Sequence, residues 1–132
     1  VMHILGDVRG KTVVIVDDIL ATAGSLHEAV AALRKQGAKD VYAAITHPLL
    51  CGPAKERLKK AGLKELVVTD TIPIPKEKSF SGIKVLSVAP LLADAICRIH
   101  NEEAISILFK SPSCKKKGRA DTSDDDEYFK LG

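Results

Sequence analysis

The sequence predicts an α/β domain, with a mostly parallel sheet and flanking helices, and three features indicate this class. Short apolar strands alternate with segments whose apolar residues repeat at helical spacing. The strand Thr12 to Val16 is apolar and β-branched without alternation, which is typical of a strand buried on both faces of a parallel sheet. The length of 132 residues is that of one domain.

The start of the chain predicts a strand over residues 1–5 and a short polar turn over 6–11, followed by the strand Thr12 to Val16. A complete doubly wound domain usually places at least one strand–helix unit before such a strand. We therefore expect the chain to be a fragment that is incomplete on its N-terminal side.

The elements after this strand follow in regular order. Leu26, Ala29, Val30 and Leu33 form one apolar stripe, so a helix is expected there, and Gly37 signals its end. Further strands are expected at 41–46, 65–69 and 83–88, and further helices after Pro53, after Pro90 and over 102–109. The intervening segments 47–53 and 70–81 contain prolines and are expected to be loops.

The composition changes from about Ser111. A basic block at 115–119 is followed by an acidic block at 121–127, and neither shows apolar periodicity. We therefore expect a domain over residues 1–110 and a charged, disordered tail over 111–132. A localisation signal in the basic block, or phosphorylation of Thr122 or Ser123, is a less favoured interpretation of the same residues.

The overall composition argues against several classes of protein. A net charge of +3 and an aromatic content of 4% do not favour nucleic-acid binding, which uses basic stripes and aromatic stacking platforms. The sequence shows no membrane-spanning run and no signal peptide. Cys51, Cys97 and Cys114 are odd in number and far apart, which fits reduced thiols of a cytoplasmic protein better than disulfides or a zinc site.

The most informative stretch is VVIVDDILATAGS at 13–25, in which a strand and two acids precede a loop of small residues and a helix. The free N–H groups and dipole at the start of a helix favour a bound phosphate. The small residues at 21–25 allow a ligand to approach the backbone. Thr22 and Ser25 add hydroxyl donors, and Gly24 permits a backbone angle that other residues resist.

Asp17 and Asp18 are expected where the strand ends, at the usual ligand edge of an open α/β sheet. A carboxylate accepts two hydrogen bonds from a vicinal diol, such as the 2- and 3-hydroxyls of ribose, and can also hold a water bound to Mg²⁺. The alternative is an acidic turn that caps the helix. Two adjacent acids followed by TAGS exceed what capping requires, so we predict a sugar-phosphate site.

The same stretch resembles the phosphoribosyl pyrophosphate (PRPP) motif that PRPP synthetases share with phosphoribosyltransferases. Other stretches resemble the synthetases alone: GDVRGK at 6–11, TH at 46–47 with CGPA at 51–54, VVTDTIP at 67–73, and the closing segment 85–109. The match runs in order from residue 1 to about 109, and the tail has no counterpart. The later stretches therefore favour the synthetase family over phosphoribosyltransferases.

The resemblance implies the C-terminal domain of an enzyme with two similar type I phosphoribosyltransferase-like domains. That family transfers the diphosphate of Mg-ATP to ribose 5-phosphate, giving PRPP and AMP, and forms dimers stacked into hexamers. ATP would bind through the N-terminal domain and neighbouring subunits. By position, Asp17 and Asp18 would hold the ribose hydroxyls and Mg²⁺. The residues that would wrap the 5-phosphate are Thr22, Ala23, Gly24 and Ser25.

The resemblance assigns no catalytic residue to this chain, because the family's nucleotide-binding residues, catalytic histidine and mobile basic loop lie upstream. The fragment alone is therefore expected to be inactive. His47 would be a neighbour of the active site, although a structural role is the alternative for a loop histidine. Ser106 and Phe109 match positions of an allosteric site, and ordinary packing is the alternative there.

Three positions depart from the family's pattern. Ala21 stands where synthetases often carry an acid, Pro48 replaces a glycine, and Ala104 replaces a serine that contacts an allosteric phosphate. Two other functions therefore stay open: a non-catalytic, synthetase-associated regulatory subunit and a phosphoribosyltransferase. The largely intact loop 22–25 favours the enzyme over the regulatory subunit.

Overall fold

The computed structural model describes Ile4 and residues 6–109. The expected strand over 1–5, apart from Ile4, and the expected tail over 111–132 lie outside the described residues. The elements are β1 (Thr12–Leu20), α1 (Gly24–Lys35), β2 (Asp40–Pro48), α2 (Ala54–Ala61), β3 (Glu65–Thr69), β4 (Ile83–Leu86), α3 (Ala89–His100) and the 3₁₀ helix η1 (Ile105–Phe109).

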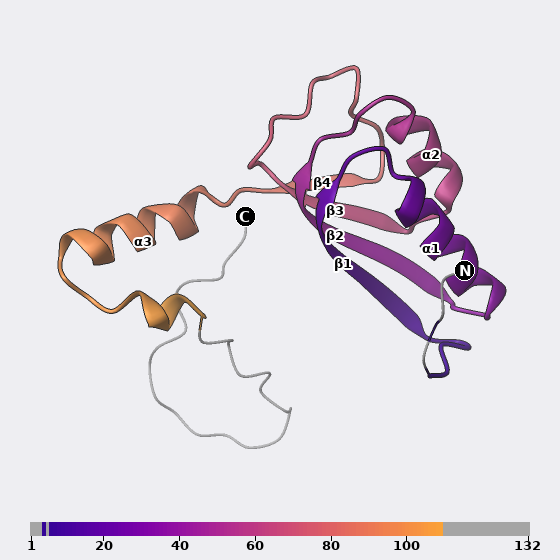
Figure 1. Ribbon diagram of the computed structural model, residues 1–132, viewed down its shortest axis with the longest axis horizontal. Coiled ribbons are helices and arrows are strands. Elements are labelled where there is room, and N and C mark those ends of the chain that lie inside the picture. The colour runs from indigo at the N-terminus through magenta and orange to yellow at the C-terminus, as the bar shows by residue number, and fades with distance from the viewer. Residues whose placement is uncertain (1–3, 5, 110–132) are drawn as a thin grey trace.

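The four strands form one parallel sheet in the order β1-β2-β3-β4 (Figure 1). Thr12 pairs with Asp40, Tyr42 with Glu65, and Leu66 with Ile83. This topology confirms the predicted α/β class with a mostly parallel sheet. Because all strands run the same way, their carboxyl ends meet at one edge.

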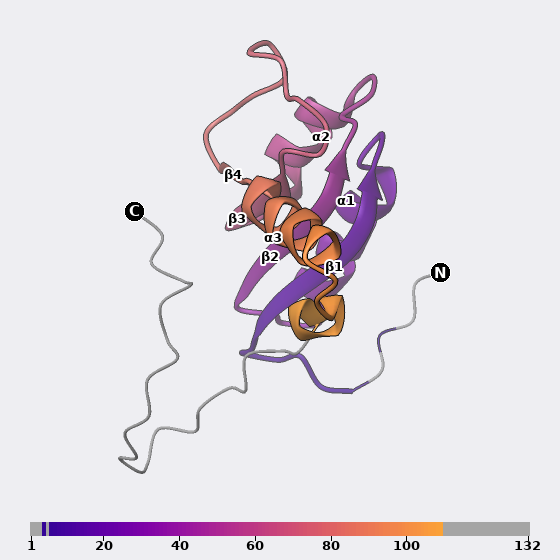
Figure 2. The same ribbon diagram turned by 90° about the vertical axis from the view of Figure 1, so that its left-hand side faces the viewer.

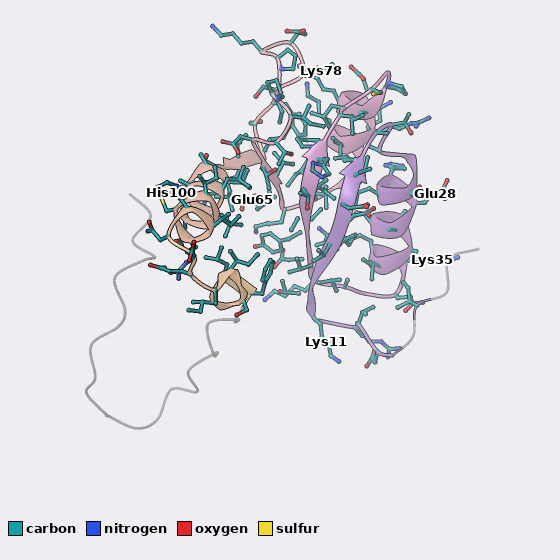
Figure 3. All side chains as sticks on the ribbon, turned by 60° about the vertical axis from the view of Figure 1, so that its left-hand side comes forward. Lys11, Glu28, Lys35, Glu65, Lys78 and His100 are labelled. Carbon is teal, nitrogen blue, oxygen red and sulfur yellow. The ribbon has the colours of Figure 1, made fainter. Side chains whose placement is uncertain are left out.

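The core lies between the sheet and the layer formed by α1 and α2. Helix α1 buries the four residues of its predicted apolar stripe. From the sheet, alternate residues of β2 and β3 are buried against this layer, with Leu66 only 1% exposed. Figure 3 shows Glu28 and Lys35 on the outer side of α1, away from the sheet.

The opposite face of the sheet is open in the described residues, so the prediction that β1 is buried on both faces is wrong. Val14 is 58% exposed and Val16 is 79% exposed. Both α1 and α2 cover the same face, whereas α3 packs against η1 and has no buried residue. Figures 1 and 2 show α3 and η1 extending away from the α1–α2 layer.

The ends of several elements follow from local hydrogen bonds. The Ala38 N–H donates to the Leu33 carbonyl at 3.0 Å, and Gly37 has φ +87°, which confirms the predicted end of α1. The last strand ends at Leu86 rather than at residue 88, because the Val88 N–H donates to the Asp70 carboxylate at 2.9 Å. Glu102 has φ +58°, and the helix expected over 102–109 is reduced to η1.

The cysteines and the helices bear on two further predictions. Cys51 and Cys97 carry exposed free thiols, as the prediction of reduced cysteines requires, while Cys114 lies outside the described residues. None of the helices in the described part of the chain has the length and apolar character needed to cross a bilayer.

Asp70 makes the stability of the β4–α3 junction depend on pH. The Ser87 hydroxyl and the Val88 N–H hold the pKa of the Asp70 carboxyl below its usual value. A lowered folded-state pKa means that the ionised form is stabilised by folding. This stabilisation is complete above the unfolded-state pKa of about 4 and disappears as the pH falls through the lower folded-state pKa.

We therefore expect Asp70→Asn to be less stable than the unaltered protein at pH 7, with a difference that shrinks below about pH 4. Urea unfolding followed between neutral and acidic pH measures this difference. Glu28→Gln is the control for the loss of an exposed carboxylate elsewhere in the chain, because Glu28 lies on the outer side of α1 (Figure 3). A gap for Asp70→Asn that stays constant down to acidic pH would contradict the prediction.

Candidate functional site

The two predicted acids lie inside β1, two residues before its end. The prediction that they mark the end of the strand is therefore wrong, since β1 continues to Leu20. In the register, Asp17 pairs with Ile45 and Ile19 with His47. The Asp18 N–H donates to the Asp17 carboxylate at 2.9 Å. Both acidic residues are exposed, so their carboxylates are accessible to a ligand.

The loop that follows β1 is fixed in place by hydrogen bonds to its carbonyl groups. Four consecutive carbonyl oxygens, from Leu20 to Ala23, accept hydrogen bonds. Their donors are, in order, the Leu50 N–H (3.1 Å), the Cys51 N–H (2.8 Å), the Arg57 Nη1 (3.0 Å) and the His27 N–H (3.0 Å). The loop is thus fixed to the segment between β2 and α2, to α2 itself and to the first turn of α1.

This arrangement turns the N–H groups of the loop in the other direction. In a trans peptide the C=O and the following N–H point in opposite directions, and the described chain has no cis peptide. The backbone N–H groups of residues 21–25 donate to no described residue. Ala23 has φ +59°, in the left-handed region, which turns successive N–H groups toward one concavity. The loop therefore presents free donors of the kind that bind an anion.

The role of Gly24 differs from the predicted one, because the unusual backbone angle belongs to Ala23. Gly24 is not in the left-handed region. A Cβ at Gly24 would lie 3.4 Å from the Arg57 Nη1. This is an ordinary van der Waals distance to the end of a flexible side chain from α2, so neither the backbone angle nor the available space requires a glycine at this position.

His47 lies beside the end of β1 and is held by a threonine network. Its Nδ1 is 2.9 Å from the Thr71 Oγ1, and the Thr71 hydroxyl donates to the Thr46 carbonyl at 2.9 Å. The Thr69 hydroxyl donates to the same carbonyl at 2.5 Å. Contact between His47 and a ligand stays a prediction.

Ser106 and Phe109 lie in η1, and both are exposed. Figures 1 and 2 show η1 away from the carboxyl ends of the strands. The structure therefore does not bring these residues together with Asp17 and Asp18. Their assignment to an allosteric site stays a prediction.

Two of the departures from the family's pattern border the loop. Ala21 is exposed, and its carbonyl accepts the hydrogen bond from Cys51, so a small residue there leaves this backbone contact intact. Pro48 is buried at the end of β2 and pairs with Leu20. Neither residue disturbs the path of the loop.

A hollow of about 250 Å³ lies elsewhere, between α2 and the start of β4. Its lining residues are Leu58, Lys59, Leu63, Leu66, Phe80, Ser81 and Gly82. None of the predicted site residues is among them. Asp17, Asp18, Thr22 and Ser25 of the predicted site are instead exposed at the edge of the sheet.

The donor set at this edge fits Mg²⁺. The described residues contain no group of three or more His, Cys, Asp or Glu side chains that could hold a metal by themselves. Mg²⁺ does not need such a cage, because one or two carboxylates suffice when water and substrate phosphates supply the other ligands. Asp17 and Asp18 provide two exposed carboxylates of this type.

Known proteins resemble this chain over most of its length. A family model described as "Phosphoribosyl synthetase-associated domain" matches residues 1–110. The chain belongs to the PRPP synthetase family. The relatives include the ribose-phosphate pyrophosphokinases of Caldanaerobacter subterraneus subsp. tengcongensis, 55% identical, and Bacillus subtilis, 51% identical. Each match covers 83% of this chain and 34% of the relative, so the chain spans about a third of their length.

A solved structure confirms the fold of this PRPP synthetase family member. The crystal structure of phosphoribosylpyrophosphate synthetase from Mycobacterium smegmatis superposes with a TM-score of 0.72 and is 46% identical. The match covers 74% of this chain and 33% of the other. Arg57 is the residue near the site that the sequence analysis missed, since its contact with the loop joins residues 35 positions apart.

Proposed function

We propose that this chain is the ribose 5-phosphate-binding part of a ribose-phosphate pyrophosphokinase, within its C-terminal domain. The observation that supports the proposal is the loop 21–25. Its N–H groups donate to none of the described residues, while the carbonyls of Ala21, Thr22 and Ala23 accept hydrogen bonds on the opposite side. This loop starts α1 and follows directly after the exposed acids of β1. An anion and a neighbouring diol are the two groups that such a site accepts.

In the proposed reaction, the anomeric hydroxyl oxygen of ribose 5-phosphate bonds to the β-phosphorus of ATP. The bond between that phosphorus and the oxygen bridging to the α-phosphate breaks, AMP leaves, and the hydroxyl proton is lost. Residues 21–25 bind the 5-phosphate, while Asp17 and Asp18 accept hydrogen bonds from the ribose hydroxyls. Such transfers depend mainly on positioning and charge neutralisation, so these residues act by orienting the sugar.

Mg²⁺ would be held at Asp17 and Asp18 and would neutralise charge on the transferred diphosphate. ATP would be bound by the rest of the protein and by neighbouring subunits of a homo-oligomer. The regulatory-subunit alternative is less favoured, because the residues 22–25 of the loop are largely those of the synthetase motif. A phosphoribosyltransferase is less favoured because the relatives named here are ribose-phosphate pyrophosphokinases.

Titration calorimetry of the 132-residue chain tests the proposal. We expect ribose 5-phosphate to bind, more tightly with Mg²⁺ present, and ribose without its phosphate to bind far more weakly. Addition of Mg-ATP to the chain with ribose 5-phosphate should give no PRPP. Equal binding of ribose and ribose 5-phosphate, or no binding of either, would overturn the proposed function.

A further inference from the structure

The side chain of Arg57 on α2 contacts the loop 21–25 on the side of its carbonyl groups. Helix α2 buries Ala54, Leu58 and Ala61, and Arg57 lies next to this buried stripe with an exposed side chain. Its Nη1 donates to the Thr22 carbonyl at 3.0 Å. Because the side chain of Arg57 is exposed, its burial does not force this hydrogen bond. The consequence of the hydrogen bond is therefore sought in the loop that accepts it.

The contact fixes the peptide between Thr22 and Ala23. With the Thr22 carbonyl directed at the guanidinium, the Ala23 N–H must point to the opposite side of the loop. Ala23 itself is in the left-handed region at φ +59°, a conformation that costs a non-glycine residue energy and needs support from its surroundings. The guanidinium of Arg57 supplies such support on one side of this residue.

The charge of Arg57 adds to this geometric effect. Arginine stays protonated in proteins, and a hydrogen bond from a charged donor is stronger than a neutral one. A peptide whose carbonyl accepts such a bond is polarised, which makes its N–H a stronger donor. The same guanidinium lies beside Gly24, where a Cβ would be in ordinary van der Waals contact with its Nη1 at 3.4 Å.

We propose that Arg57 is a positioning residue that orients the N–H groups of the loop 21–25 toward the phosphate of the substrate. The proposal rests on the proposed function of this loop. Arg57 lies on the carbonyl side of the loop and acts through the Thr22–Ala23 peptide, not by direct contact with the phosphate.

Arg34 offers a matched control within the same helical layer. It also donates to backbone carbonyls, with its Nη2 2.9 Å from the Gly62 oxygen and its Nη1 bonded to the Lys39 oxygen. These contacts join the end of α1 to the end of α2, at the opposite end from the loop. Removal of Arg34 should affect stability in a similar way without affecting the loop.

The test compares Arg57→Ala, Arg57→Lys and Arg34→Ala in the 132-residue chain. Calorimetric titration with ribose 5-phosphate and with inorganic phosphate should show roughly tenfold weaker binding of both ligands for Arg57→Ala. Arg57→Lys should recover part of the affinity, because lysine keeps the positive charge but lacks the planar guanidinium group with its several N–H donors. Arg34→Ala should bind within about twofold of the unaltered chain. Unchanged binding by Arg57→Ala, or an equal loss in Arg34→Ala, would overturn the proposal.

Absence of binding by the unaltered chain would overturn the proposed function, whereas normal binding by Arg57→Ala overturns only the role of Arg57.

Discussion

Replacement of Leu66 by alanine is expected to lower the free energy of unfolding by about 2–5 kcal/mol. Leu66 lies on β3, is only 1% exposed and belongs to the hydrophobic core between the sheet and the helical layer. Truncation removes buried methyl groups and leaves a cavity that closely packed neighbours fill only in part. A loss of this size is large for a domain whose total stability is about 5–15 kcal/mol.

Urea unfolding of the 132-residue chain, followed by circular dichroism, measures this loss. Val16→Ala is the matched control, because Val16 also lies on a strand of the same sheet but is 79% exposed. Its substitution should change the free energy of unfolding by no more than about 0.5 kcal/mol. Equal losses at the two positions would mean that the open face of the sheet is covered in solution.

Asp18→Asn is expected to weaken the binding of ribose 5-phosphate by about 10- to 100-fold. The neutral amide cannot match a carboxylate as acceptor for two sugar hydroxyls, because its NH₂ group donates hydrogen bonds and cannot accept one, and its single neutral oxygen is a weaker acceptor than a carboxylate oxygen. The substitution also removes one of two charges that would attract Mg²⁺. We therefore expect the strengthening of binding by Mg²⁺ to be reduced as well.

Titration calorimetry with and without Mg²⁺ measures both effects. Asp40→Asn is the control for the loss of one carboxylate. Asp40 lies at the start of β2, opposite the ligand edge, where it forms an ion pair with Lys64 at 3.7 Å. Its substitution should leave binding unchanged. Binding by Asp18→Asn equal to that of the unaltered chain would contradict the assignment of Asp18 to the sugar.

Much of the local structure was predictable because it depends on short-range patterns. The stripe of Leu26, Ala29, Val30 and Leu33 specifies both the helix α1 and the face that it buries. The alternation of strands and helices specifies parallel pairing. The errors occur at element ends: β1 runs past its acids to Leu20, and β4 stops at Leu86, where the Asp70 carboxylate receives the Val88 N–H.

The sequence by itself determined the fold class, the family and the stretch at 13–25 that carries the proposed site, because these depend on the order and spacing of residue types. Only the tertiary structure showed how the loop in that stretch is held. Its carbonyls are bonded by Leu50, Cys51 and Arg57, which approach through the packing of α2 against α1. Local periodicity indicates which face of an element is apolar, but it does not indicate which distant segment covers that face. For this reason, neither the open side of β1 nor the contact of Arg57 with Thr22 could be predicted from the sequence pattern.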